Sequence, residues 1–184
     1  MSSDSEMEEL VVLVDELNQE IGTLPKAEIH SDHTPLHRAF SVFLFNDQNE
    51  VLLQQRSVLK KTWPLMWSNS CCGHPLPGEK TEDAIRRRVQ FELGISKIEG
   101  LHEVLPDFRY RAERGGIVEN EICPVWVGNT TQNPLLNSAE VEAYRWWDWN
   151  AFVSEIEQFP ERYSEWAGWE VKELRAKCGW LFSI

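Results

Sequence analysis

One segment, Thr81–Leu93, constrains the fold most, because helix signals mark both of its ends and strand-like segments lie on both sides of it. Thr81 is a suitable N-cap, and two acidic residues occupy the first turn. Gly94 can end the helix in a left-handed conformation, and apolar residues recur between these ends at roughly helical spacing. The sequence therefore predicts one well-bounded helix enclosed by strands.

Runs of β-branched and aromatic residues before and after this helix predict strands. Two hairpins are expected before it, Glu9–Pro25 with a turn near Asn18-Gln19 and Arg38–Phe45 followed by Val51–Arg56. The strands expected after it are Leu101–Leu105, Phe108–Ala112, Ile117–Val127 and Tyr144–Trp149, with a tight turn at Gly115-Gly116. Two last helices, Asn150–Gln158 and Ser164–Lys177, are separated by Pro160 and stopped at Gly179. This order predicts an α+β fold in which helices pack on a mixed sheet.

The composition predicts a single globular domain. The 184 residues are 42% hydrophobic and 26% charged, which is enough for one core. Residues 1–8 are acidic and rich in serine, so we expect a disordered leader there and one domain over residues 9–184. No apolar run approaches the ~18–20 residues that cross a bilayer, and the start of the chain lacks the features of a secretory signal. We therefore expect a cytoplasmic protein.

Charge limits the partners that the chain can bind. A formal net charge of −12 repels nucleic acid and anionic membranes over most of the surface, so we expect neither as a partner. A small anionic substrate would need a metal ion or a local group of cations. Nothing in the sequence indicates an oligomeric state.

The histidines are few and concentrated in one part of the chain. Four of the five are His30, His33, His37 and His74. His33 and His37 are four residues apart, but Pro35 between them argues against a zinc-binding helix and favours a loop that leads into a strand. Metal ligands would then converge from separate segments. Surface or structural histidines are the alternative.

Two glutamates lie in a segment that has the pattern of a central strand. In a strand, Glu119 and Glu121 share one face, whereas Val118 and Ile122 point to the other. Such paired carboxylates are commonly just solvated, but the stretch 122–127 is almost wholly apolar. Like charges in a central strand need a cation between them, and carboxylates with neutral imidazoles suit a first-row divalent ion.

A third pattern, Asn69–Pro75, places two thiols beside a histidine. The chain has 4 cysteines, too few and too irregularly spaced for a disulfide framework or a paired zinc site. A buried inert cysteine is the default interpretation, and a thiol beside a metal-bound histidine is a candidate acid/base. Spacing alone does not decide between Cys71 and Cys72.

The loop and helix that follow resemble a degenerate Nudix box, the loop–helix–loop that binds divalent metal and diphosphate. The matching residues are Gly73, Glu79, Arg87, Glu92, Gly94 and Ile95. Arg88 and Phe91 stand where Nudix hydrolases have glutamates that help to assemble the hydrolytic metal ions. Their presence argues against cleavage of a diphosphate.

Further motifs narrow the resemblance: NSCCGHP, PDFRYRA, IVENEICP and the spacing from His30 to His37. From about Lys26 to Trp166 the chain resembles type I isopentenyl-diphosphate isomerase, a Nudix-fold enzyme. The resemblance implies a Nudix-like α/β/α sandwich with a mixed sheet, to which the N-terminal hairpin and C-terminal helices are additions. It also implies isomerisation of isopentenyl diphosphate to dimethylallyl diphosphate in isoprenoid biosynthesis, by metal-assisted protonation and deprotonation through a carbocation-like intermediate.

The resemblance also implies a role for individual residues. The implied metal ligands are His30, His37, His74, Glu119 and Glu121. The ion among them would be Mn²⁺ or another divalent ion, Mg²⁺ or Zn²⁺, whereas Glu92 would serve a Mg²⁺ bound to the diphosphate. The implied acid/base residues are Cys72 on one side of the substrate and Glu121 with Tyr110 on the other. The implied substrate contacts are Lys26, Arg56 and Lys60 at the diphosphate and Trp166 over the hydrocarbon.

Two alternatives belong to other functional classes. A Nudix hydrolase of nucleoside diphosphate derivatives would have no use for NSCCGHP. A metal-binding scaffold without activity would tolerate changes at Cys72 and Tyr110, yet the motifs around both residues are intact.

Overall fold

The computed structural model of the chain describes residues 9–178. The expected leader and the expected helix stop at Gly179 lie outside these residues. The smaller of two mixed sheets has the order β2-β1-β3-β10-β9, formed by β1 (Leu10–Val14), β2 (Glu20–Pro25), β3 (His37–Arg38), β9 (Arg109–Arg114) and β10 (Ile117–Ile122). The larger sheet has the order β12-β5-β4-β11-β8, with β6 attached to β5 and β7 to β4. Its strands are β4 (Phe40–Phe45), β5 (Glu50–Arg56), β6 (Trp67–Ser68), β7 (Cys71–Gly73), β8 (Glu99–Leu105), β11 (Val125–Asn129) and β12 (Val141–Asp148).

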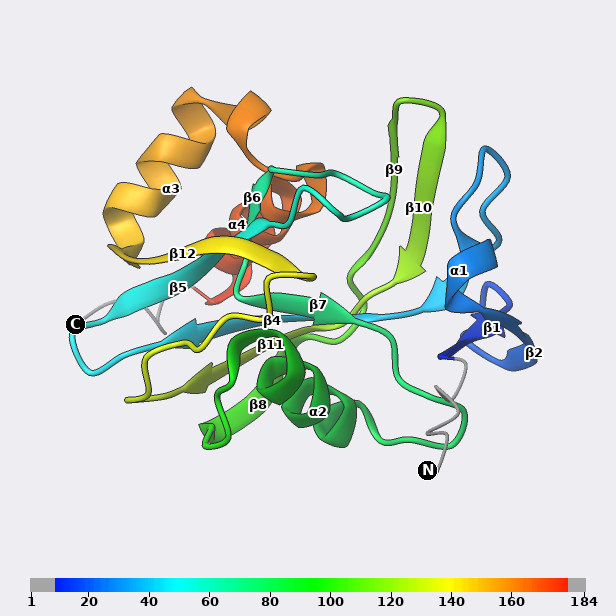
Figure 1. Ribbon diagram of the computed structural model, residues 1–184, viewed down its shortest axis with the longest axis horizontal. Coiled ribbons are helices and arrows are strands. Elements are labelled where there is room, and N and C mark those ends of the chain that lie inside the picture. The colour runs from blue at the N-terminus through cyan, green and yellow to red at the C-terminus, as the bar shows by residue number, and fades with distance from the viewer. Residues whose placement is uncertain (1–8, 179–184) are drawn as a thin grey trace, which may run out of the picture.

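Helices cover both faces of the larger sheet (Figure 1). One face packs against α2 (Thr81–Leu93), and the other against α3 (Trp149–Gln158) and α4 (Glu165–Cys178). Alternation along β4 explains this, because Phe40, Val42 and Leu44 are buried with α2, whereas Phe43 and Phe45 are buried with α3 and α4. A short helix α1 (Lys26–Ile29) and a 3-10 turn η1 (Pro160–Arg162) complete the chain. The predicted α+β sandwich with a Nudix-like layering is confirmed.

The central helix has the predicted bounds, and only its N-cap was assigned wrongly. Lys80 takes the N-cap position without a side-chain hydrogen bond, so Thr81 is already helical. Gly94 ends the helix as expected, with φ 65° and its N–H bonded to Gln90 O. A Cβ atom at Gly94 would lie 2.8 Å from Leu135, so the position requires glycine for its space as well as its backbone angle.

Two predicted strand arrangements differ from the structure in a way that matters for the site. The hairpin of β4 and β5 keeps its turn, but the strands pair only at Phe45 and Val51, because β7 pairs with the first half of β4. The segment Ile117–Val127 is broken at Cys123-Pro124 into β10 and β11, which belong to different sheets. The chain therefore crosses between the sheets three times, from β3 to β4, from β8 to β9 and from β10 to β11, and the candidate site lies at this junction.

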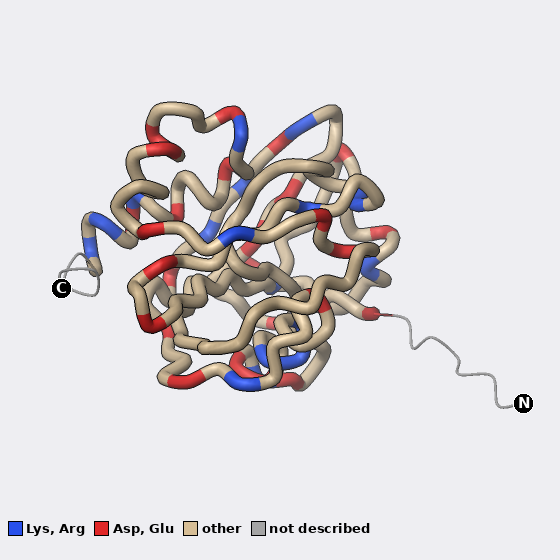
Figure 2. Tube along the Cα trace, turned by 60° about the vertical axis from the view of Figure 1, so that its left-hand side comes forward, with Lys and Arg blue, Asp and Glu red and all other residues tan. Residues whose placement is uncertain are grey.

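The distribution of charged residues over the fold agrees with the acidic composition. Acidic positions are spread over the whole trace with basic positions among them (Figure 2). Among residues 9–178, none of the helices is both long and apolar enough to cross a membrane.

Candidate active site

Strand register places three of the candidate residues side by side. Glu121 on β10 is paired with His37 on β3 in the parallel direction and with Tyr110 on β9 in the antiparallel direction. Neighbouring residues in register lie about 5 Å apart and point to the same face of a sheet. Residues that are far apart in sequence are therefore brought into one row by backbone pairing alone.

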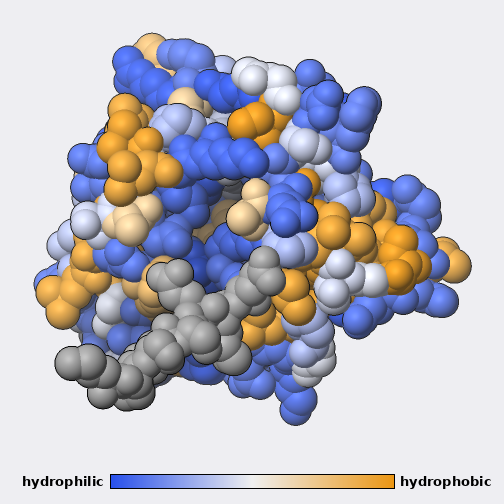
Figure 3. All heavy atoms as spheres, turned by 45° about the vertical axis from the view of Figure 1, so that its right-hand side comes forward, coloured by the Kyte–Doolittle hydropathy of each residue, from blue (hydrophilic) through white to orange (hydrophobic). Residues whose placement is uncertain are grey.

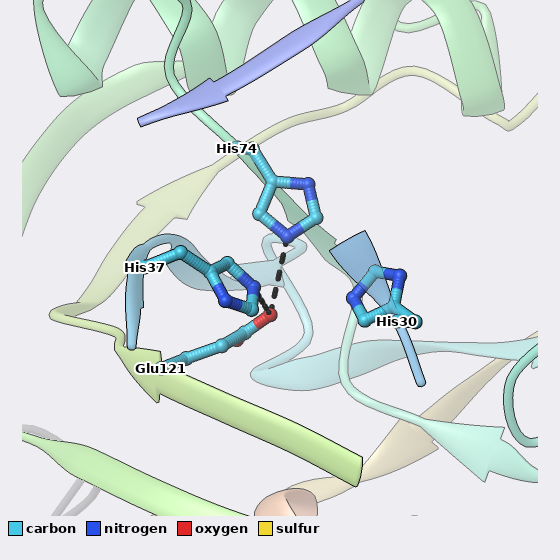
Figure 4. Close-up of side chains that lie close together, drawn as sticks. All are labelled: His30, His37, His74 and Glu121. Carbon is cyan, nitrogen blue, oxygen red and sulfur yellow. Dashed lines mark hydrogen bonds and ion pairs between the residues drawn. The ribbon is translucent and has the colours of Figure 1, made fainter. Parts of the chain in front are cut away.

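The side chains of three histidines and one glutamate, two of which belong to this row, point toward one another (Figure 4). His30 follows α1, His74 follows β7, and their ligand atoms with those of His37 and Glu121 all lie within 4.8 Å of one another. Oε1 of Glu121 lies 3.2 Å from Nε2 of His74 and 3.3 Å from Nε2 of His37. The sequence pattern predicted that these ligands come from separate segments. The structure brings the ligands together.

The second predicted carboxylate lies at the edge of this group. Oε2 of Glu119 is 2.7 Å from Nε2 of His30, and the Glu119 residue is 5% exposed. Glu119 and Glu121 share a face of β10, as their spacing predicted, while Ile122 packs in a small apolar cluster with Val12 and Val14. His33, in contrast, has a side chain that is 92% exposed and stays apart from the cluster.

The donor atoms of the cluster fit a metal ion. Nε2 of His30 lies 2.7 Å from Oε2 of Glu119 and Nε2 of His37 lies 3.3 Å from Oε1 of Glu121, yet these buried atoms form no well-aligned hydrogen bond with the described residues. Buried polar atoms are normally paired, so several unpaired lone pairs that converge on one point favour a cation between them. Imidazole nitrogens mixed with carboxylates suit first-row divalent ions. The cluster could thus hold a divalent metal ion.

The protonation states of the cluster favour the same interpretation. Burial lowers the pKa of His74 to about 4, so its imidazole is neutral and available as a ligand. Burial would raise the pKa of Glu121, but the imidazoles of His37 and His74 beside it hold that pKa well below its usual range. Burial likewise opposes protonation of His37, and Glu121 outweighs it and raises that pKa. Glu121 is thus an anion shared by two histidines.

Strand alternation separates the two adjacent cysteines. On β7, Cys71 is buried in the apolar cluster under α2, whereas Cys72 points to the opposite side and lines a cavity with His74. Cys72 Sγ lies 3.2 Å from Ser41 Oγ and 3.1 Å from Asn69 Oδ1. Of the two thiols, only that of Cys72 faces the candidate site.

Aromatic side chains close the far side of the cavity. Tyr110 donates its hydroxyl hydrogen to Glu121 Oε2 at 2.8 Å and stacks on Trp166, with ring centroids 5.6 Å apart. Burial and the neighbouring Glu121 carboxylate raise the pKa of Tyr110 well above its usual value, so the phenol keeps its proton. Trp166 itself is 2% exposed and lines the same cavity.

The site has two parts. The inner cavity, about 60 Å³, is lined by Lys26, His30, Arg56, Lys60, Thr62, Cys72, Gly73, His74, Arg88, Tyr110, Glu119, Glu121 and Trp166. The outer recess, about 520 Å³, shares Lys26, His30, Lys60 and Thr62 with it and is otherwise lined by Glu9, Ala27, Leu59, Lys61, Ala139 and Glu140. The space-filling view shows a hollow on the face where mostly hydrophilic residues gather (Figure 3). A small polar chamber thus adjoins a wider, lysine-rich entrance.

Comparison with known proteins identifies the family. The NUDIX domain family matches residues 35–167. An isopentenyl-diphosphate Delta-isomerase from Paenarthrobacter aurescens is 51% identical over 169 residues, which are 90% of each chain. Another from Kocuria rhizophila is 45% identical over 180 residues, which are 96% of this chain and 99% of that one. The chain belongs to the isopentenyl-diphosphate Delta-isomerase family.

A solved structure supports the fold of this isomerase family member independently of its sequence. A crystal structure of a protein from Deinococcus radiodurans superimposes with a TM-score of 0.68 over 92% of this chain and 99% of that one. The two are 18% identical, so the likeness concerns the fold alone.

The three cations predicted to contact a diphosphate all reach the inner cavity, but each already has a partner. Lys26 Nζ is 2.8 Å from a carboxylate oxygen of Glu9, and Lys60 Nζ is 2.5 Å from one of Glu140. Arg56 donates to the backbone oxygen of Thr62 at 2.8 Å. An anion that binds here would compete with these contacts.

Glu92 lies deeper than its predicted role requires. It is 3% exposed, it does not line the inner cavity, and its Oε1 is 2.5 Å from Arg88 Nη2. Arg88 does line the inner cavity, and it also lies 3.3 Å from Glu140. Nearby in the Nudix box, the Glu79 carboxylate accepts hydrogen bonds from Arg87 at 2.7 and 2.8 Å.

Sequence reasoning assigned no role to four contributors to the isomerase-family site. Arg88 was noted only as a departure from the hydrolase pattern, although a cation inside a phosphate-binding motif is itself a signal. Ser41 and Asn69 hold Cys72, and pairing of β4 with β7, which the sequence did not predict, brings Ser41 there. Glu140 stands in no motif, and nothing in the sequence distinguishes it from other surface acids.

Proposed function

We propose that this protein isomerises isopentenyl diphosphate to dimethylallyl diphosphate in isoprenoid biosynthesis. Relatives that are 51% and 45% identical over nine-tenths or more of this chain carry the name of this reaction. The observation that carries the mechanism is that Cys72 and the hydrogen-bonded pair of Glu121 and Tyr110 line the same cavity.

The reaction adds a proton at C4 of the substrate and removes one from C2. An alkene is a weak base, so the transfer needs one acid and one base on either side of a flat three-carbon unit. Cys72 serves one side, and Glu121 with the Tyr110 hydroxyl serves the other. Trp166 presents its ring to the positive charge that develops between them, a contact worth about 1–2 kcal/mol when desolvated.

A divalent ion held by His30, His37, His74, Glu119 and Glu121 would stabilise the Glu121 carboxylate and fix its orientation; Mn²⁺, Mg²⁺ or Zn²⁺ would suit these ligands. Lys26, Arg56 and Lys60 bind the diphosphate, and Glu92, now paired with Arg88, would help to hold the Mg²⁺ that accompanies it.

The direct test is incubation of the metal-loaded protein with isopentenyl diphosphate and Mg²⁺ in heavy water, followed by NMR. We expect dimethylallyl diphosphate with solvent deuterium in a methyl group. Unchanged substrate would contradict the proposal. Release of phosphate would indicate a Nudix hydrolase instead, and nucleoside diphosphates would then be the substrates to screen.

A further inference from the structure

Glu170 on α4 is a buried carboxyl that belongs to none of the sequence motifs. The residue is 0% exposed, and neither of its carboxyl oxygens has a hydrogen-bond partner among the described residues. Buried polar groups in folded proteins are nearly always paired, because an unpaired one is destabilising. We therefore expect a glutamate in this position to have a role beyond packing.

The surroundings of Glu170 favour its neutral form. Burial raises its pKa well above the usual value, the Ser41 hydroxyl opposes this, and the Glu121 carboxylate adds to the rise. A neutral carboxylic acid carries one O–H donor, which an ionised carboxylate lacks. Ser41 is the hydroxyl residue whose proximity lowers the pKa of Glu170, although the two side chains form no hydrogen bond in this structure.

Ser41 also belongs to a closed network around Cys72. Asn69 Nδ2 donates to Ser41 Oγ at 2.8 Å, Ser41 Oγ lies 3.2 Å from Cys72 Sγ, and Cys72 Sγ donates to Asn69 Oδ1 at 3.1 Å. An amide NH₂ group only donates, so Ser41 Oγ accepts from Asn69. The hydroxyl hydrogen of Ser41 then has two possible acceptors, the Cys72 sulfur and the Glu170 carboxyl.

The orientation of the Asn69 amide is fixed by the backbone. Its Nδ2 also faces the carbonyl oxygens of Val42 at 3.1 Å and Cys71 at 3.0 Å. Carbonyl oxygens only accept, so the nitrogen and not the oxygen must point toward them. The direction of hydrogen bonding around Ser41 is therefore set on one side, and Glu170 decides the other.

We infer that Glu170 is a positioning residue for Cys72: its protonated carboxyl donates to Ser41 Oγ and so directs the Ser41 hydroxyl hydrogen toward the Cys72 sulfur. This bond would satisfy a carboxyl of which neither oxygen has a hydrogen-bond partner among the described residues. It also places a donor at the sulfur, where negative charge develops when Cys72 gives up its proton. The inference rests on the proposed function, since it assumes that Cys72 exchanges a proton with the substrate.

Two substitutions of similar size separate a hydrogen-bond donor from a packing role. Glu170→Gln keeps a donor that cannot ionise, whereas Glu170→Met fills similar space without one. We expect the glutamine variant to keep kcat within about threefold and the methionine variant to lose roughly 10-fold in kcat with KM unchanged. Equal activity of the methionine variant and the wild type would overturn the inference. An inactive glutamine variant would overturn it too, because the proton of Glu170 would then be transferred.

A double-mutant cycle tests whether the effect runs through Ser41. Ser41→Ala should cost about as much as Glu170→Met, and combining the two should add little, because both remove the same donor from the sulfur. Fully additive losses would show that Glu170 acts by another route.

Infrared difference spectroscopy of wild type minus Glu170→Gln at neutral pH gives a readout that needs no turnover. We expect a carbonyl band of a neutral carboxylic acid that the variant lacks, and its absence would overturn the inference. If metal-loaded wild type fails to isomerise the substrate, the proposed function fails, while this band still reports on Glu170. If wild type is active and Glu170→Met equals it, only the inference about Glu170 fails.

Discussion

The inner cavity and the outer recess adjoin one another, but they differ in whether their polar side chains are paired within the protein. In the inner cavity, Nε2 of His30, Nε2 of His37 and Oε2 of Glu119 are buried without hydrogen-bond partners among the described residues. At the boundary with the outer recess, Lys26 is paired with Glu9 and Lys60 with Glu140. Polar atoms of the inner cavity are thus left without hydrogen bonds, whereas the charged side chains at the outer recess are paired with one another.

The difference indicates what each part exchanges with its ligand. Buried metal-ligand atoms without hydrogen bonds destabilise the free protein and favour a bound metal ion that is rarely released. Exposed or half-buried ion pairs contribute little to stability and can be broken by a competing anion. This contrast supports the proposal of a metal ion held in the inner cavity and a diphosphate bound transiently near the outer recess.

The largest expected effect comes from neutralising the centre of the inner cavity. Glu121→Gln removes the anion shared by His37 and His74, so we expect loss of bound metal and a decrease in turnover of about 10³-fold or more. Metal analysis and turnover measure the two effects. Glu113→Gln, at a side chain that is 58% exposed on the neighbouring β9, is the matched control and should change neither. Unchanged metal content in Glu121→Gln would refute the ligand assignment.

The next effect compares the two cysteines of β7. Cys72→Ala should lower turnover by about 10²–10⁴-fold with fold and metal content unchanged, because an acid/base group is lost. Cys71→Ala should retain turnover and lose about 1 kcal/mol of stability, because it leaves a small void under α2. Turnover assays and denaturant unfolding on both variants check the pair. Full activity of Cys72→Ala would remove this thiol from the mechanism.

How far the sequence predicted the site also differs between its two parts. The ligands of the inner cavity stand in short motifs, and alternation along β10 was enough to place Glu119 and Glu121 on one face. Glu9 and Glu140 are about 130 residues apart in the chain, and Arg88 lies within 4 Å of both. Local patterns carry no information about such long-range ion pairs.

The same reason explains the errors in the predicted fold. Helix α2 was predicted with correct bounds, because its end signals are local. The pairing of β7 with β4 depends on which strand competes for the edge of β4, and the two-residue strands β3 and β6 are too short to show a pattern. Glu170 escaped notice because burial of a single glutamate in a helix is decided by tertiary packing.

A smaller effect is expected at the boundary of the outer recess. Lys60→Met removes a cation that a diphosphate would use, so we expect kcat/KM to fall by about 10–30-fold, mainly through KM. Steady-state kinetics at fixed Mg²⁺ measure the change. Lys97→Met, at a lysine that is 71% exposed outside both cavities, is the control. A fall in kcat without a change in KM would place Lys60 in the chemistry and would weaken the contrast between the two parts.

The smallest effect concerns stability at acid pH. Burial would raise the pKa of Glu140, but Lys60 and Arg88 outweigh it and lower this pKa to about 2. A carboxyl with a lowered pKa in the folded state stabilises the protein above its unfolded pKa, near 4.5, and this contribution is lost as the pH falls toward 2. Glu140→Gln should therefore remove about 1–2 kcal/mol of the pH-dependent loss over that window, since partial exposure screens the pairs. Denaturant unfolding of both proteins at pH 6 and at about pH 3 measures it. Parallel losses in the variant and the wild type would mean that the ion pairs at this boundary are already neutralised by solvent, and the outer recess would then be open to anions without displacing any carboxylate.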